Sequence, residues 1–226
     1  PVVCTSPALG RPQDAALLPE SPLRAALAGV EDGWRLLKAL AEGDPGCGAA
    51  VGCLLGLAIG DAVGHPLEFV PVDQHLPDGR GGTYSDTQRP CLLPKLAAGQ
   101  LQYQNSYNRF VLQPGQWTDD CSMALCLADS LLVHGTFHGG DARCRWHMWW
   151  THGYCNAFRH DEARPTRCSV GLGGNVAKSL DEIEDYALDQ QHAADKVPAV
   201  YGSSKNDAGN GTIMRLAPVP IAYSRD

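Results

Sequence analysis

The stretch that decides the fold is CGAAVGCLLGLAIGDAVGHPLE, residues 47–68. Its glycines recur at every fourth position: Gly48, Gly52, Gly56, Gly60 and Gly64. Residues four apart share one face of an α-helix, so these glycines form a stripe that carries no side chain. Such a stripe lets another backbone approach closely, although each glycine costs up to about 1 kcal/mol in helix propensity. We therefore predict a buried helix at the centre of a helical domain, ended by Pro66.

Further helices are predicted around this segment from apolar residues spaced three and four apart. The predicted ranges are 23–42, 123–133, 142–158 and 175–191. Residues 71–115 contain scattered Pro, Gly, Asn and Gln and are predicted to form a long loop region with short elements. Alternating strand-like runs are scarce, so the predicted class is all-α.

The composition is that of an ordinary globular protein and argues against some classes of partner. Of the 226 residues, 44% are hydrophobic and 19% are charged, which argues against wholesale disorder. The formal net charge is −7 and there is no basic run, so nucleic acid is not an expected partner. The most apolar stretch, residues 47–59, is shorter than the ~20 residues that span a bilayer, so no membrane association is expected.

The cysteines bear on the compartment. The chain has nine, and none of them forms a C-x-x-C pair. Several lie in apolar, helix-like runs, where a free thiol behaves as a small hydrophobic group. This pattern favours a reducing compartment, and we expect an intracellular, cytoplasmic protein.

Two adjacent acids follow a hydroxyl residue in Thr118-Asp119-Asp120, just before the predicted helix 123–133. Thr118 is a good N-cap, and the helix dipole favours an acid in the first turn. Capping explains one acid well but two less well, because adjacent carboxylates repel each other. The alternative is that a cation holds them together, and hydroxyl and carboxylate oxygens suit Mg²⁺ or Mn²⁺ rather than zinc. Both interpretations remain open at this point.

Glu68 and two glycine-rich turns are further candidate site residues. Glu68 follows the end of the glycine-rich helix, where the helix dipole disfavours a purely structural acid. It could act as a general base, and a solvated loop acid is the alternative. The turn at 209–211 and the turn that contains Gly171 could offer backbone N–H groups to an anion such as phosphate. Taken alone, either turn is more often just a tight turn.

A cluster of possible zinc ligands gives a third interpretation. Its members are Cys144, His147, His152, Cys155 and His160. They are interleaved with tryptophans and a tyrosine, and their spacing matches no zinc finger. We therefore favour an aromatic helix that packs in the core, with His134 and His138 as a pair at a helix end.

Taken together, these segments resemble the ADP-ribosylglycohydrolase family. The resemblance rests on three segments that occur in the family's order, residues 52–68, 117–120 and 209–215, and it extends from Ala50 to Tyr223. It implies an all-α, orthogonal helical bundle. It also implies hydrolysis of the glycosidic bond between ADP-ribose and a modified protein side chain or a small acceptor.

The resemblance further implies roles for individual residues. Thr118, Asp119 and Asp120 match residues that coordinate a pair of Mg²⁺ ions, and Asp120 is expected to be catalytic together with Glu68. Glu68 matches an acid near the scissile bond, which acts as a base or as a gate over the metals. The positions at which the family's loops hold the ADP-ribose diphosphate and ribose are Gly171, Gly209, Asn210 and Gly211. The expected partner is an ADP-ribosylated protein or a small ADP-ribose conjugate, and we expect a monomer.

One part of the family pattern has no counterpart in these 226 residues. The family has a second metal motif near its C-terminus, Asp-x-Asp followed by Thr or Ser, whereas the only acid after Arg215 is Asp226. We therefore expect a partly flexible extension with one helix over residues 1–45 and a family domain over 46–226 that lacks its C-terminal part. The 226 residues alone are expected to be weakly active or inactive. The alternative is a non-catalytic relative that binds ADP-ribose or has a structural, crystallin-like role.

Overall fold

The structure, a computed structural model, describes residues 32–68, 110–158, 169–184, 193–205, 207 and 209–224. Within these residues the regular structure is helical, without a strand, which confirms the predicted all-α class. The longer helices are α3 (Gly33–Gly43), α4 (Pro45–Gly64), α5 (Asp119–His134), α6 (Gly139–His152) and α7 (Gly174–Glu184). The shorter elements are η1 (His65–Leu67), α8 (Ala193–Lys196), α9 (Gly211–Met214) and α10 (Pro218–Ala222).

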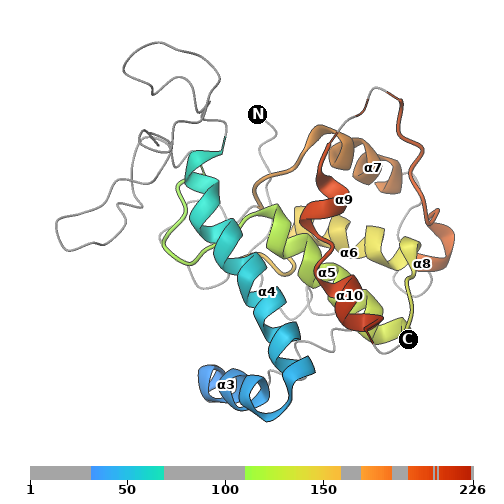
Figure 1. Cartoon of the computed structure of the whole chain (residues 1–226). Helices are drawn as coiled ribbons and strands as arrows, with labels where there is room; N and C mark the ends of the chain where they lie inside the picture. The colour runs from blue at the N-terminus through green and yellow to red at the C-terminus, as the bar shows by residue number, and fades with distance from the viewer. Residues whose placement is uncertain are drawn as a thin grey trace, which may run out of the picture.

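Helices α5 and α6 pack against each other at the centre of the described fold, and α4, α7, α8, α9 and α10 lie around them (Figure 1). α7 and α8 lie against α6, whereas α4, α9 and α10 contact α5. α3 packs against α4, at the end of α4 that is remote from η1. This arrangement brings the C-terminal end of α4 to the N-terminal end of α5.

The core between α5 and α6 is built from aromatic and sulfur-containing side chains. One buried cluster consists of Met123, Cys126, Met148, Trp149 and Tyr154. A large apolar side chain buried this completely stabilises the fold by roughly 2–3 kcal/mol. The predicted aromatic helix in the core is therefore confirmed. The cysteines that the structure describes are free thiols.

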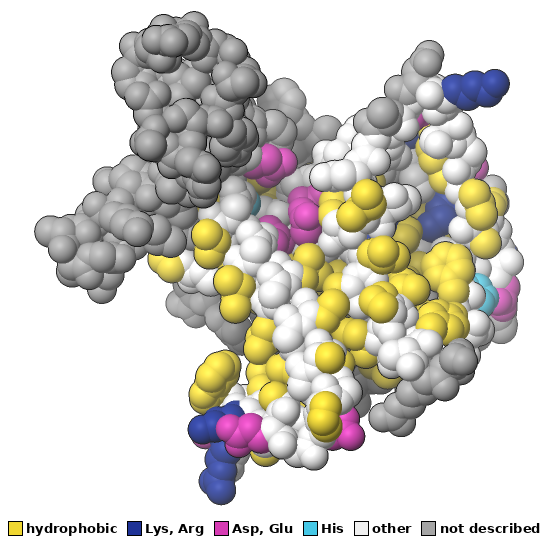
Figure 2. All heavy atoms as spheres, in the orientation of Figure 1, with side chains coloured by type: hydrophobic (Ala, Val, Ile, Leu, Met, Phe, Trp, Pro, Cys, Tyr) yellow, Lys and Arg dark blue, Asp and Glu magenta, His cyan; other side chains and the backbone are white. Residues whose placement is uncertain are grey.

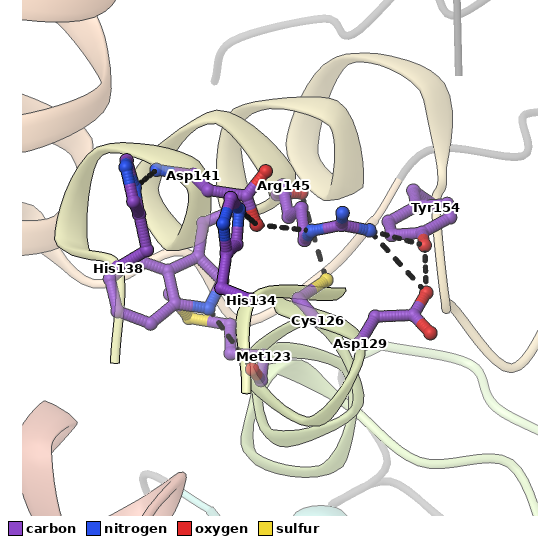
Figure 3. A network of polar contacts seen from close by, with 9 residues as sticks. Met123, Cys126, Asp129, His134, His138, Asp141, Arg145 and Tyr154 are labelled. Carbon is purple, nitrogen blue, oxygen red and sulfur yellow. Dashed lines mark hydrogen bonds and ion pairs between the residues drawn. The ribbon is translucent and has the colours of Figure 1, made fainter. Parts of the chain in front are cut away.

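A buried polar network also joins α5 to α6 (Figure 3). The Arg145 guanidinium donates from Nε to Asp141 at 2.6 Å and from Nη1 to the Tyr154 hydroxyl at 3.2 Å. Its Nη1 lies 3.6 Å from an oxygen of Asp129, which also accepts the Tyr154 hydroxyl proton. Burial acts to raise the pKa of Asp141, but the hydrogen bond and charge of Arg145 outweigh it, so this pKa is lowered. Each charge in this network is paired, as burial requires.

The limits of α6 differ from the predicted range 142–158. The helix begins earlier, at Gly139, because the His138 side chain at the N-cap accepts the Asp141 N–H at 3.0 Å. It ends at His152, because Gly153 adopts the left-handed conformation with φ of 69°. Residues 153–158 therefore form turns rather than helix.

The other predicted ranges are confirmed in part. The predicted helix 123–133 is observed over 119–134, and Gly135, whose φ is 66°, is its C-cap. Helix 175–191 is observed over 174–184, and residues 185–192 lie outside the described residues. Helix 23–42 is observed over 33–43, and residues 1–31 lie outside them. Most of the predicted loop region 71–115 also lies outside the described residues.

The prediction that the glycine-rich helix lies buried at the centre is wrong for the described part of the chain. Ala62 is the only buried residue of α4. Four glycines of the stripe have no described atom within 4 Å of the position that a Cβ would occupy: Gly52, Gly56, Gly60 and Gly64. Gly48 alone makes the predicted close approach, with the Ala41 carbonyl oxygen 2.9 Å from such a Cβ. The stripe permits a close contact, but it does not by itself supply the apolar surface that would draw a neighbour onto it.

α4 is the one described helix that is long and apolar enough to cross a membrane, judged by length and composition alone. It has 20 residues and a mean hydropathy of 1.7 over 18 of them, so it is longer than the apolar stretch 47–59 on which the sequence prediction rested. The core helix of a water-soluble protein can have the same length and composition, but such a helix is mostly buried, whereas only 6% of this stretch of α4 is buried. The last turn of α4 is hydrogen-bonded to α5 through Asp61.

Candidate active site

The predicted residues Thr118, Asp119 and Asp120 lie at the N-terminal end of α5, beside the last turn of α4. Asp61 of that turn accepts the Thr118 N–H at 3.0 Å, the Thr118 hydroxyl at 2.6 Å and the Cys121 N–H at 3.0 Å. Thr118 occupies the N-cap position, as predicted, but its hydroxyl accepts no N–H group of α5. The predicted capping role is therefore filled by Asp61. The reason is that the Thr118 hydroxyl donates to a carboxylate on another helix instead of accepting from its own.

Glu68 lies close to these acids. Pro66 lies in η1, which follows α4, and the Glu68 N–H donates to the His65 carbonyl at the end of this turn at 3.1 Å. The Glu68 side chain is exposed, just beyond the glycine-rich helix, as predicted. Partial burial raises its pKa, and the negative charges of Asp120 and Asp61 raise it further. Glu68 therefore belongs to the same group of acids, although about 50 residues separate it from α5 in the sequence.

The acids of α5 are destabilised in their charged form. Burial raises the pKa of Asp119 to about 7, and the charge of Asp120 is the next largest contribution. Burial also raises the pKa of Asp120, followed by the charge of Asp61. Figure 2 shows acidic atoms gathered beside the end of α4, where no Lys or Arg is visible next to them. We refer to Asp61, Glu68, Asp119 and Asp120 as the acidic cluster.

Among the described residues, positive charge is scarce around the acidic cluster. None of its members forms an ion pair with a Lys or Arg of the described residues. Arg215, after α9, feels the charge of Asp119, but burial is the larger effect and lowers its pKa to about 10. Its guanidinium lies 4.1 Å from the centre of the Trp146 ring, and Nη1 is 3.4 Å from the Met123 sulfur. Arg215 is therefore held by the core rather than by a carboxylate.

The predicted glycine turns lie next to α7, and one of them touches the acidic cluster. Gly171 has a φ of 89°, and a Cβ there would overlap the Asp119 carboxylate. Only glycine fits a turn that passes this close in a left-handed conformation. A Cβ on Gly209 would lie 3.7 Å from Asn175, in the first turn of α7. Asn210 is the N-cap of the short helix α9, makes no side-chain capping bond and is exposed.

Gly211 lies at the same end of α7, where a Cβ on it would be 3.8 Å from Val176. The turns at 171 and at 209–211 therefore meet at the start of α7. The predicted metal, catalytic and substrate residues are thus neighbours in the fold, with Gly171 against the acids and Gly209 and Gly211 against α7.

The candidate zinc ligands lie elsewhere. Cys144, His147 and His152 are on α6, Cys155 is in the following turn, and His160 lies outside the described residues. Within the described ranges, no three or more His, Cys, Asp or Glu side chains are close enough together to hold a metal ion. This holds for the acidic cluster as well, so those ranges alone supply no complete set of ligands.

His134 and His138 form the predicted pair at a helix end. His134 is the last residue of α5 and His138 precedes α6. Their rings stack with centroids 4.4 Å apart.

Sequence reasoning missed Asp61 and Arg215. Asp61 carries a signal that could have revealed it, because it is the only charged residue in the otherwise apolar sequence of α4. A lone charge in such a helix needs a partner, and here the partners are Thr118 and Cys121. Arg215 carries no comparable signal, since its contacts with Trp146 and Met123 join positions far apart in the chain.

Comparisons with known proteins show the family to which the chain belongs. The family model of ADP-ribosylglycohydrolase matches residues 47–226. An ADP-ribosylarginine hydrolase of Pseudomonas putida is 34% identical over 176 residues, which cover 76% of this chain and 35% of that protein. The corresponding hydrolase of Serratia proteamaculans is 33% identical over 174 residues, which cover 76% of this chain and 36% of that protein.

A more distant relative is the ADP-ribosyl-[dinitrogen reductase] glycohydrolase of Rhodospirillum rubrum. It is 27% identical over 180 residues, which cover 76% of this chain and 44% of that protein. The chain thus spans less than half the length of these curated relatives. Because the family model matches most of its residues, the chain belongs to the ADP-ribosylglycohydrolase family.

Proposed function

We propose that this protein hydrolyses the glycosidic bond between ADP-ribose and a side chain of a modified protein. The observation that carries the proposal is the acidic cluster, in which two sequence segments of the family converge beside the glycine turn at 171. The names of the relatives indicate the linkage. The two relatives above 30% identity are named as ADP-ribosylarginine hydrolases, so we propose ADP-ribosylated arginine as the substrate.

The cation that we propose is Mg²⁺, with Mn²⁺ as a substitute. The donor chemistry fits, because Thr118, Asp119 and Asp120 offer only oxygen atoms, the ligands that hard divalent cations prefer. The charge balance also fits, because the carboxylates repel one another and no described cation neutralises them. The number of ligands is incomplete within the described ranges. In the family pattern two ions are held, with further ligands from a second motif.

The roles of the protein's own residues follow from their positions. When bound, the cation supplies positive charge that orients ribose hydroxyls and polarises water. Glu68 is exposed beside Asp120, and we propose that it accepts a proton from the attacking water. The water oxygen then bonds to the anomeric carbon of the ribose, the bond from that carbon to the arginine nitrogen breaks, and the nitrogen takes up a proton.

We propose that the glycine turns hold the rest of the ADP-ribose. Gly171, Gly209, Asn210 and Gly211 lie at or near the start of α7. Backbone N–H groups at a helix start favour anions, which suits a diphosphate. Absence of side chains at Gly209 and Gly211 leaves room for a ligand to approach the backbone, whereas the missing side chain at Gly171 makes room for the Asp119 carboxylate.

A second candidate function is ADP-ribose binding without hydrolysis. The observation that favours it is the lack of a group of three metal-ligating acids in the part of the chain that the structure describes. Binding would then depend on the glycine turns and on a weakly held cation.

One experiment separates the two functions. The purified protein is incubated with an arginine-ADP-ribosylated peptide and Mg²⁺, and released ADP-ribose is measured by chromatography. Hydrolysis that is lost in Asp120→Asn, but kept in Asp181→Asn on the exposed face of α7, supports the enzyme. Binding of ADP-ribose without its release supports the second function, and neither binding nor release contradicts both.

A further inference from the structure

Asp61 holds the start of α5 from a neighbouring helix. One carboxylate accepts hydrogen bonds from three donors: the Thr118 amide, the Thr118 hydroxyl and the Cys121 amide. Thr118 and Cys121 are the N-cap and third residues of α5, so Asp61 satisfies donors that the helix leaves unpaired at its end. A hydrogen bond to a charged acceptor is about twice as strong as one between neutral groups.

The hydrogen bond from the Thr118 hydroxyl has a chemical consequence. A hydroxyl has one proton to donate and two lone pairs that accept. At an ordinary N-cap the oxygen accepts an N–H of its own helix, which occupies a lone pair. Here the proton goes to Asp61 at 2.6 Å and the oxygen accepts no N–H of α5. Its lone pairs are therefore not used by the helix that it begins.

We propose that Asp61 is a positioning residue, which fixes the Thr118 hydroxyl as an electron-pair donor and sets the first turn of α5 beside α4. Asp119 and Asp120 form that first turn, so the same contacts set their backbone positions. This inference rests on the proposed function, because the electron-pair donor serves a cation. An asparagine at position 61 could not replace the carboxylate, because its amide N–H₂ would face donors.

The test measures binding of Mn²⁺ to the 226-residue protein by electron paramagnetic resonance. Asp61→Asn and Thr118→Val are each expected to raise the Kd for Mn²⁺ by about tenfold or more, the equivalent of one lost hydrogen bond to a charged group. The double variant is expected to bind within about twofold of the weaker single variant, because residues that act as a unit are not additive. Thr118→Ser keeps the hydroxyl and should retain most of the affinity.

Asp44→Asn is the matched control. Asp44 caps α4 by accepting the Cys47 N–H at 2.9 Å, so the variant makes the same chemical change at a helix start remote from the acidic cluster. It is expected to change stability but to leave the Kd for Mn²⁺ within about twofold. If the role of Asp61 were purely structural, Asp61→Asn and Asp44→Asn would have the same effect on the Kd for Mn²⁺. An Asp61→Asn variant that binds Mn²⁺ as wild type does, or additive effects of the two substitutions, would overturn the proposal.

Hydrogen exchange of the backbone amides gives a readout that needs no cation. In Asp61→Ala, exchange at Thr118 and Cys121 is expected to accelerate by about tenfold or more relative to amides at the C-terminal end of α5. Unchanged exchange at these two amides would show that Asp61 does not hold the turn. Wild-type protein that binds no Mn²⁺ would instead contradict the proposed cation and, with it, the role of the hydroxyl as a ligand.

Discussion

The negative charge of Asp119 is expected to destabilise the folded protein at neutral and alkaline pH. Its ordinary pKa is 3.8 and its pKa in the fold is about 7, raised by burial and by Asp120. The unfolded chain therefore releases this proton near pH 3.8, whereas the folded chain keeps it until about pH 7. Between these values the folded state binds more protons, so stability falls as pH rises. A pKa difference of one unit corresponds to about 1.36 kcal/mol, so the largest possible loss in the free energy of unfolding is about 4 kcal/mol.

Asp119→Asn removes this titration without changing the size of the side chain beside Gly171. The variant is therefore expected to become more stable relative to wild type as pH rises. The difference in free energy of unfolding, variant minus wild type, should grow by about 2–4 kcal/mol between about pH 4 and about pH 8. The measurement is urea denaturation across this range, with a chelator present to remove divalent cations. In Asp181→Asn, an exposed control, the same difference should stay within about 0.5 kcal/mol at every pH.

A difference for Asp119→Asn that stays flat, or that falls as pH rises, would refute the reasoning. It would mean that a group outside the acidic cluster already neutralises Asp119. Adding Mg²⁺ provides an internal check, because a cation that binds the folded state stabilises it by mass action. Mg²⁺ should therefore raise the stability of wild type at about pH 8 and leave that of Asp119→Asn nearly unchanged.

Three further substitutions test the described contacts by chemical denaturation. Gly171→Ala is expected to lower the free energy of unfolding by about 1–3 kcal/mol, because the new Cβ would overlap Asp119 and because φ is positive at this position. Gly173→Ala is the control, because a Cβ there meets open space, and it should change stability by less than about 0.5 kcal/mol. Equal effects of the two substitutions would contradict the close approach of Gly171 to Asp119. Tyr154→Phe is expected to cost about 1–3 kcal/mol, because it leaves buried polar partners unsatisfied, and to leave Mn²⁺ affinity unchanged. Arg145→Met is expected to cost about 3–5 kcal/mol, since it leaves buried carboxylates unpaired, and a loss below about 1 kcal/mol would show that this network contributes little.

The core helix α6 could be predicted from the sequence because its tryptophans and methionine are large apolar side chains, which are mostly buried in folded proteins. The end of α6 was missed, although Gly153 marks it. Glycine occurs both inside helices and after them, and only its left-handed backbone distinguishes the two. The N-cap of α5 was identified correctly at Thr118, because a threonine followed by acids is a strong helix-start pattern, although the predicted range 123–133 begins four residues after the observed start at Asp119.

The position of α4 could not be predicted in the same way. A glycine stripe shows that a backbone could approach, but it does not specify which backbone. Among the described residues, the backbone of Ala41 alone lies close to the stripe, at Gly48. The role of Asp61 was hidden for a similar reason, since its partner Thr118 lies 57 residues away in the chain. Contacts of this kind follow from the packing of helices, which local patterns do not encode.

The central claim is that the acidic cluster and the glycine turns form one cation-dependent site for ADP-ribose. Its most direct test is calorimetric titration of ADP-ribose into the protein in Mg²⁺ and in a chelator, repeated with Asp120→Asn. The account predicts saturable binding to wild type in Mg²⁺ that disappears in the chelator and in the variant. Absence of binding in Mg²⁺, or the same Kd under all three conditions, would contradict it.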